Sequence, residues 1–409
     1  MKPDSQGAAP SRRGYDIAIA AVAVLLAFSL VHGSRFLENL SVVHWEDIAF
    51  ARHNAANIHS LRDCFTQRPL WPGLYRPLTT NLYYYLGGVV FDNRIEVYHC
   101  INAFLYLANA LLLYFICRRL LPGWWALVPP VLFVSRLSHV EVIINTCEFQ
   151  TLLAVCLSLT AIWLFMSARQ MPRQSPKSRL LYTISLVCYV LALLSKETAL
   201  VLPAILLAYG LMYDKRRAWR LYAALAAVTA GYILLFRYVL RGVTDYEPTG
   251  FSFNTGLNHI LAGFASYLLA FINLVTYRLE SVVMVPAIPG LAASWPARAL
   301  FAAACAVCAA YMALRAAAGG GPPPDIERGQ VNLQNRGADG TSPGKYRLWG
   351  DAMAWGFAFF VAASSPYVIL KSRLFMRYGY AGHAGLAIAA GAVLCRLAGM
   401  LAGRMGAGE

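Results

Sequence analysis

Charged side chains are scarce in this sequence of 409 residues. Asp, Glu, Lys and Arg together make up 13% of it, about half the share found in an ordinary soluble domain. Hydrophobic residues make up 58%, and the mean hydropathy is +0.51. One soluble core cannot bury that much apolar surface, whereas a bilayer can. The composition therefore excludes an ordinary soluble protein and predicts an all-α polytopic membrane protein.

Acidic residues are particularly few, 20 against 35 basic ones, which gives a net charge of +15. The basic residues gather in short links between apolar runs, at 118–119, 169–179 and 215–220. Such clusters mark the cytoplasmic side of a membrane protein. They argue against a nucleic-acid partner and predict that both termini are cytoplasmic.

Metal-binding cysteine patterns and internal repeats are also lacking. Most of the nine cysteines lie inside apolar runs. Cys305 and Cys308 form a CxxC pair, but it sits in an Ala-rich segment without a second pair or a nearby His. The pattern is typical of two small helix residues and predicts neither a zinc site nor a redox site.

Apolar runs recur along the whole chain, which we expect to form a single membrane domain over 1–409. Including the ambiguous segment 260–286, we predict ten to twelve spans. The candidate spans are 17–31, 101–117, 124–134, 151–166, 180–194, 199–213, 221–240, 299–314, 352–363 and 386–401. The Gly- and Pro-rich segment 319–345 is expected to be a flexible cytoplasmic loop.

The first link between spans, 33–98, is long in a protein whose other links are mostly short, and it is predicted to be external. Loops beyond about 15 residues are usually functional or disordered. Aromatic residues such as Trp71, Tyr83 and Phe91 occur throughout this loop. That density favours ordered, amphipathic helices on the membrane surface over disorder.

Two adjacent acids, Glu46 and Asp47, follow the first span within His44-Trp45-Glu46-Asp47. Neighbouring carboxylates repel each other, which can raise the pKa of one of them. A carboxylate placed at the membrane surface can accept a proton from a hydroxyl nucleophile. The pair is therefore a candidate general base.

Polar motifs follow the acidic pair in a fixed order along the chain. They are Tyr75-Arg76-Pro77-Leu78, Tyr98-His99-Cys100-Ile101-Asn102, Ser138-His139-Val140-Glu141, Ser195-Lys196-Glu197 and Arg377-Tyr378-Gly379-Tyr380. In this order, the set resembles the membrane part of the transmembrane and tetratricopeptide-repeat O-mannosyltransferases. More distantly it resembles the protein O-mannosyltransferases; all belong to the GT-C superfamily. The resemblance covers roughly residues 15–400, without the tetratricopeptide repeats and with Glu-Asp where the family has Asp-Asp or Asp-Glu.

The resemblance implies a GT-C-type bundle in the cell (inner) membrane. It also implies an inverting transfer of a sugar, mannose being one candidate, from a polyprenyl-phosphate carrier to an acceptor hydroxyl on the external face. Asp47 or Glu46 would be the base, with Asp47 favoured, and Arg76, Lys196 and Arg377 would bind the donor phosphate. Supporting roles fall to His139, Glu141, Glu197 and Tyr378. No cofactor is required by the pattern; the acceptor class (protein, lipid or glycan) and the use of a divalent metal stay open.

Two other functions fit a polytopic membrane protein. A transporter or lipid flippase usually places ionisable residues in the middle of its spans, often in two related halves. A polysaccharide polymerase or ligase usually has its large loop late in the chain. Here the ionisable residues flank the spans and the large loop comes first, which favours the glycosyltransferase.

Overall fold

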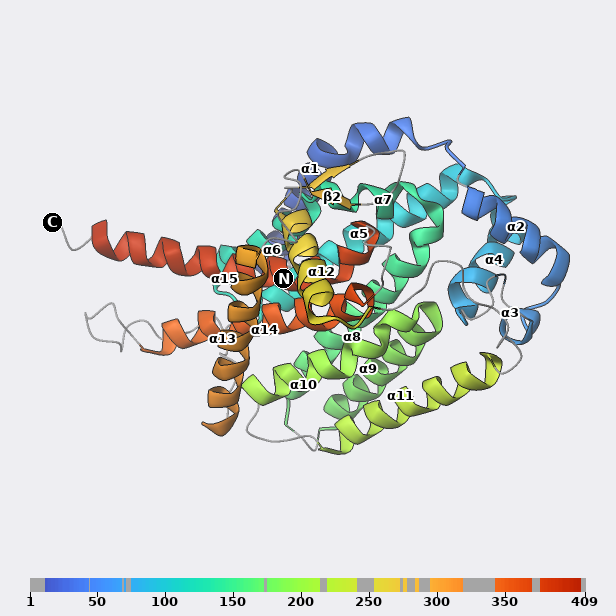
Figure 1. Ribbon diagram of the computed structural model, residues 1–409. Helices are drawn as coiled ribbons and strands as arrows, with labels where there is room; N and C mark the ends of the chain where they lie inside the picture. The colour runs from blue at the N-terminus through green and yellow to red at the C-terminus, as the bar shows by residue number, and fades with distance from the viewer. Residues whose placement is uncertain are drawn as a thin grey trace, which may run out of the picture.

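The protein is predominantly helical in a computed structural model (Figure 1). The structure describes residues 12–43, 45–67, 70, 75–172, 175–213, 219–240, 254–272, 275–277, 284–286, 295–318, 343–369 and 376–405. The all-α polytopic architecture expected from the composition is confirmed.

Six helices in the described part are long and apolar enough to cross a membrane, and a bent pair could supply a seventh span. The six are Tyr15–Glu38, Ile95–Cys117, Thr146–Arg169, Pro176–Ser195, Arg298–Ala317 and Arg377–Ala402. The bent pair, Gly123–Val134 and Leu137–Ile144, turns by 57°. Three shorter apolar helices accompany them: Glu197–Tyr213, Trp219–Leu235 and Leu257–Phe271. The count is lower than the ten to twelve predicted, in part because these three helices are shorter than a span requires. The predicted span 352–363 lies in α14 (Pro343–Val368), which is long enough but is not among the candidate spans of the described part.

The large first link is folded into short helices. Beyond α1 (Arg12–Glu38), the chain forms α2 (Trp45–Asn57), α3 (Asp63–Thr66), the π-helical turn η1 (Pro77–Leu82) and α4 (Tyr83–Phe91). In Figure 1 the blue helices α2, α3 and α4 lie together on the right, on the opposite side from the C-terminus. Burial of Phe50, Tyr83, Tyr84 and Tyr98 in one aromatic group explains why this link is ordered.

The middle of the chain alternates long helices with short turns. Its elements are α5 (Ile95–Cys117), η2 (Gly123–Leu127), α6 (Val128–Val134), η3 (Leu137–His139), α7 (Val140–Ile144), η4 (Thr146–Glu148), α8 (Phe149–Arg169), α9 (Pro176–Ser195), η5 (Glu197–Val201), α10 (Leu202–Tyr213) and α11 (Trp219–Leu240). The predicted spans 101–117, 151–166, 180–194 and 221–240 each lie within one of these helices. The predicted spans 124–134 and 199–213 each begin in a 3₁₀ turn and continue into α6 and α10.

The last third of the chain packs two long helices tightly together. Its elements are α12 (Leu257–Phe271), the strands β1 (Val275–Tyr277) and β2 (Met284–Pro286), α13 (Trp295–Ala317), α14 (Pro343–Val368), η8 (Met376–Gly379) and α15 (Tyr380–Met405). A Cβ atom on Gly385 would lie 2.5 Å from Gly356 O and 2.5 Å from Phe360 N. Glycine therefore permits the close backbone approach of α14 and α15, a common device in membrane helix packing. The close packing of α14 and α15 also holds in position the turn η8, which directly precedes α15 and contains Arg377.

The ambiguous segment 260–286 divides into two parts. Its first residues continue α12, a 15-residue helix, and its last ones belong to the antiparallel pair of β1 and β2. The intervening residues lie outside the described part of the chain. The expected flexible loop 319–345 also lies outside it, apart from its last three residues, which begin α14.

The basic ends of several helices meet at one side of the bundle. Arg118, at the end of α5, lies 3.7 Å from the Asp16 carboxylate in α1. Arg119 donates to Gln170 at the end of α8, at 3.1 Å. The start of α1 and the ends of α5 and α8 therefore share one side, as the predicted cytoplasmic position of the basic links requires.

This orientation is open to a labelling test in a Cys100→Ser background, because Cys100 is an exposed native thiol. Asn57→Cys, exposed at the end of α2, should react with an impermeant maleimide in intact cells. Lys177→Cys, exposed in the first turn of α9, should react only after permeabilisation. The reverse pattern would overturn the orientation.

Candidate functional site

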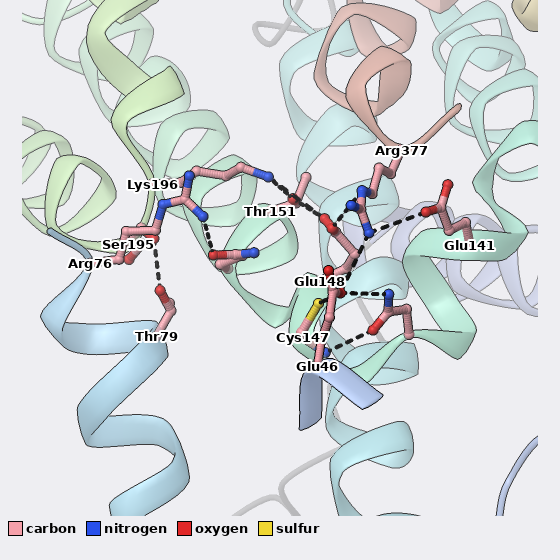
Figure 2. A network of polar contacts seen from close by, with 12 residues as sticks. Glu46, Arg76, Thr79, Glu141, Cys147, Glu148, Thr151, Ser195, Lys196 and Arg377 are labelled. Carbon is pink, nitrogen blue, oxygen red and sulfur yellow. Dashed lines mark hydrogen bonds and ion pairs between the residues drawn. The ribbon is translucent and has the colours of Figure 1, made fainter. Parts of the chain in front are cut away.

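Charged side chains from five segments converge at one end of the bundle (Figure 2). We call this group the charge cluster. It contains Glu46 of α2, Glu141 of α7, Glu148 of η4, Lys196 between α9 and η5, and Arg377 of η8. The cluster brings together four of the ordered sequence motifs.

Arg377 lies at the centre of the charge cluster. Its Nη1 is 3.2 Å from Glu141 Oε1 and 3.7 Å from Glu46 Oε2, and its Nε is 3.2 Å from Glu148 Oε1. The side chains of Glu141 and Glu148 are only 4% and 2% exposed. Withdrawing such ions from water costs several kcal/mol each, so they require opposite charges and hydrogen bonds close by. Arg377 provides this compensation for three carboxylates at once.

Lys196 reaches the same cluster from the other side, and Figure 2 shows Glu148 between it and Arg377. The chain is extended at Lys196, which separates α9 from η5. Lys196 Nζ donates to Thr151 Oγ1 at 2.6 Å and lies 3.7 Å from Glu148 Oε2. The Thr151 hydroxyl in turn donates to Glu148. The two cations are thereby joined through one buried carboxylate.

The cluster has a net charge of −1 when all groups are ionised, since three carboxylates face two cations. Both cations already have carboxylate partners. An anionic ligand that contacts Arg377 or Lys196 must therefore take the place of a carboxylate, or draw one of the cations toward itself. The cluster is thus preorganised to exchange one set of charged contacts for another.

Arg76 and Glu197 form a second ion pair next to the cluster. Arg76 Nε donates to Glu197 Oε2 at 2.6 Å, and its Nη2 donates to the other oxygen of the same carboxylate. Nη1 donates to Gln150 Oε1 at 2.5 Å. Burial acts to lower the pKa of Arg76, but the Glu197 charge outweighs it and the pKa is raised. Arg76 is a permanent cation that ties the first link to α8 and η5.

A charge-neutral double variant tests whether the Arg76–Glu197 pair stabilises the fold. Arg76→Gln alone leaves Glu197 without its partner and should cost about 3–5 kcal/mol of stability. Arg76→Gln with Glu197→Gln should recover most of this in thermal unfolding, because neither position then carries a charge. A double variant as unstable as the single one would refute the stabilising role of the Arg76–Glu197 pair. Donor saturation in the stable double variant tests the separate prediction that Arg76 meets the donor phosphate.

The adjacent acids Glu46 and Asp47 point into different surroundings, because neighbouring helix positions do not share a face. Glu46 faces Arg377, whereas Asp47 is buried and accepts a hydrogen bond from Tyr84 at 3.1 Å. Burial and the Asp47 charge raise the pKa of Tyr84 well above its ordinary value, so its hydroxyl keeps its proton. Of the two acids, Glu46 forms the ion pair with Arg377.

His139 lies outside the charge cluster, in a chain of buried polar groups. His383 Nε2 donates to the Tyr267 carbonyl at 3.0 Å, so its Nδ1 is left to accept from His139 Nε2 at 2.9 Å. The Tyr106 hydroxyl lies 3.0 Å from His139 Nδ1 and 3.2 Å from the Val134 carbonyl, so two acceptors share its one proton. These contacts tie η3 to α5, α12 and α15. His139 therefore holds in place the turn from which Glu141 reaches Arg377.

Tyr378 packs beside both cations of the cluster. Its ring stacks on Tyr367 with centroids 4.3 Å apart, and its centroid lies 5.8 Å from Lys196 Nζ and 5.7 Å from Arg377 Cζ. A ring in this position stabilises cations through its negative face.

Sequence reasoning missed several members of the site: Asn145, Cys147, Glu148, Gln150, Thr151 and His383. Glu148 carried a usable signal, since an acid at the start of an apolar span is costly and rarely without function. The predicted span began at 151, which left Glu148 in an apparent turn. His383 and Gln150 carried no such signal, because they fall just outside the predicted spans 386–401 and 151–166, where polar residues are common.

Within the described residues, no three His, Cys, Asp or Glu side chains are grouped so as to hold a metal ion. The carboxylates of the charge cluster converge on the Arg377 guanidinium instead.

Comparisons with protein-family models, curated proteins and solved structures found no match for this chain. Any family relationship therefore rests on the order of the motifs.

Proposed function

We propose that this protein is an inverting, GT-C-type membrane glycosyltransferase of the cell (inner) membrane. It takes a sugar from a polyprenyl-phosphate carrier and moves it to an acceptor hydroxyl on the external face. The observation that carries the proposal is the meeting of Glu46, Glu141, Lys196 and Arg377 in one buried cluster. The first and last of these residues, Glu46 and Arg377, are 331 positions apart in the sequence. Each of the four residues belongs to a different motif of the ordered set.

The chemistry needs a base for the acceptor and cations for the leaving group. In the proposed reaction the acceptor hydroxyl oxygen bonds to the anomeric carbon of the sugar. At the same time the Glu46 carboxylate takes the proton of that hydroxyl. The bond between that carbon and the carrier phosphate oxygen breaks, and its electron pair leaves with the phosphate. Arg377 and Lys196 stabilise the departing phosphate by charge-assisted hydrogen bonds. As Arg377 turns toward the phosphate, its ion pair with Glu46 weakens.

An apolar cavity close to the cations supports a lipid-linked donor. It lies between α8, η5, α10, α14 and α15, and Val155, Thr198 and Ala381 are among its lining residues. Thr198 is two positions from Lys196, Val155 is one helical turn from Thr151, and Ala381 is four positions from Arg377. A phosphate held by the cations would therefore have an apolar wall beside it for the start of its lipid.

The bent helix pair favours a second candidate, a transporter or lipid flippase. Interrupted helices often line the binding sites of transporters, and α6 and α7 lie in a pair bent by 57°. The two candidates differ in outcome. A glycosyltransferase makes a new glycosidic bond, whereas a transporter moves an unchanged molecule.

Purified protein in vesicles, supplied with radiolabelled polyprenyl-phosphate sugars and a mixed acceptor lysate, separates these functions. The proposal predicts label in a protein, lipid or glycan acceptor together with release of the free carrier phosphate. Movement of intact, labelled donor across the bilayer without transfer would favour the transporter and overturn the proposal.

A further inference from the structure

We propose that Cys147 and Asn145 are positioning residues for Glu46, holding one carboxylate oxygen so that the other faces the acceptor. This inference rests on the proposed function of Glu46 as the base. Neither residue belongs to the ordered motifs, and both lie in the turn between α7 and α8.

All three contacts that Glu46 makes with described residues use the same oxygen, Oε2. Cys147 Sγ donates to it at 2.7 Å and Asn145 Nδ2 donates at 3.3 Å. Arg377 Nη1 lies 3.7 Å from it. The Glu46 side chain is 21% exposed, whereas Cys147 is only 6% exposed. One oxygen is therefore anchored from the protein side, and Oε1 is left for a substrate proton.

The orientation of the Asn145 amide is determined by its other contacts. Asn145 Oδ1 accepts from the Cys147 backbone N–H at 3.2 Å and so caps η4. Its amide nitrogen must then be the atom that faces Glu46. The Asn145 carbonyl accepts from Asn102 at 2.9 Å, which ties the turn to α5. The donor to Glu46 is thus fixed by a cap and by a neighbouring helix.

The Cys147 thiol is suited to act as a donor. It is packed with Phe50, Tyr83, Tyr84 and Tyr98, away from bulk water. A thiolate here would put another negative charge beside Glu46 and Glu148, so the thiol keeps its proton. Such a thiol is a neutral donor that adds no competing charge to the cluster.

Donors directed at a carboxylate favour its charged form and limit its rotation. Loss of the Cys147 donor should therefore allow the Glu46 carboxylate to rotate away from the acceptor. Arg377, Glu141 and Cys147 are charged or titratable groups that face Glu46, and Glu148 and Asp47 lie close to the same Cys147 thiol. Cys147→Ala and Cys147→Ser leave the others unchanged, so a difference between these two variants reports on the donor itself.

The kinetic test compares Cys147→Ala with Cys147→Ser. Losing a hydrogen bond to a charged group should lower kcat by about tenfold to a hundredfold, with little change in the KM for donor. Cys147→Ser restores a hydroxyl donor and should recover most of the lost kcat. Cys64→Ala removes another buried thiol, one that donates to Ser60 O, and should behave as wild type.

An infrared measurement tests the contact without any activity. The S–H stretching band that disappears in Cys147→Ala should move in Glu46→Gln, because the acceptor has lost its charge. If wild type transfers no sugar, the proposed function fails, but this band still tests the contact. An S–H band unaffected by Glu46→Gln, or a Cys147→Ala variant with wild-type kcat, would overturn the inference.

Discussion

Glu46→Gln is expected to lower the rate of sugar transfer by a factor on the order of 10²–10⁴, the usual effect of removing a positioned base. The variant keeps the shape of the side chain and can still accept from Cys147 and Asn145. Its fold should therefore survive, because Arg377, Cys147 and Asn145 keep an acceptor oxygen and lose only its charge. The measurement is the initial rate at saturating donor, with thermal unfolding to verify that the protein is folded.

Asp47→Asn is the matched control, since it removes the neighbouring charge from the same helix turn. The motif resemblance favours Asp47 as the base, but the contacts favour Glu46. The amide oxygen that Asp47→Asn introduces can still accept from Tyr84, so we expect a small effect on the rate. An inactive Asp47→Asn beside an active Glu46→Gln would contradict this assignment.

Arg377→Met is expected to have the largest effect on stability of any single change in the cluster. It removes the central cation and leaves three carboxylates with Lys196 as their one cation in the cluster. Removing one partner of a buried ion pair typically costs about 3–5 kcal/mol. Thermal unfolding of the purified protein should show this loss. Arg118→Met, which breaks the more exposed pair with Asp16, should cost less than about 1 kcal/mol.

Combining Arg377→Met with Glu141→Gln separates stability from function. The double variant has the original net charge of −1, with two carboxylates and Lys196. It should recover much of the lost stability, because Glu141 no longer requires a cation. Donor saturation should remain weakened, since the proposed phosphate ligand is still missing. Full recovery of donor use would show that Arg377 only compensates buried acids.

The helices were predictable from the sequence because a span is a local property. An apolar run such as 101–117 identifies α5 without reference to the rest of the chain. The bend near Ser135 was not predictable in this way, since the turn at Leu137–His139 depends on contacts of His139 with α15. The aromatic residues of the first link predicted that it is ordered, but they did not predict its individual helices.

The site was predictable only in part. The motif order identified Glu46, Glu141, Lys196 and Arg377, and the structure brings these residues together. Which of Glu46 and Asp47 faces the cluster depends on the rotation of α2 about its axis, which the sequence does not define. His139 was grouped with Glu141 because they are two positions apart, yet its ring contacts His383, 244 positions away.

The most direct test of the central claim is a comparison of wild type and Glu46→Gln, purified side by side and given the same labelled polyprenyl-phosphate sugars. The measured quantity is acceptor-bound label, together with the free polyprenyl phosphate that is released. The account predicts equal amounts of both products from wild type and at least a hundredfold less from Glu46→Gln, on the scale expected for a lost base. No transfer by folded wild type with any donor, or equal transfer by the two proteins, would contradict it.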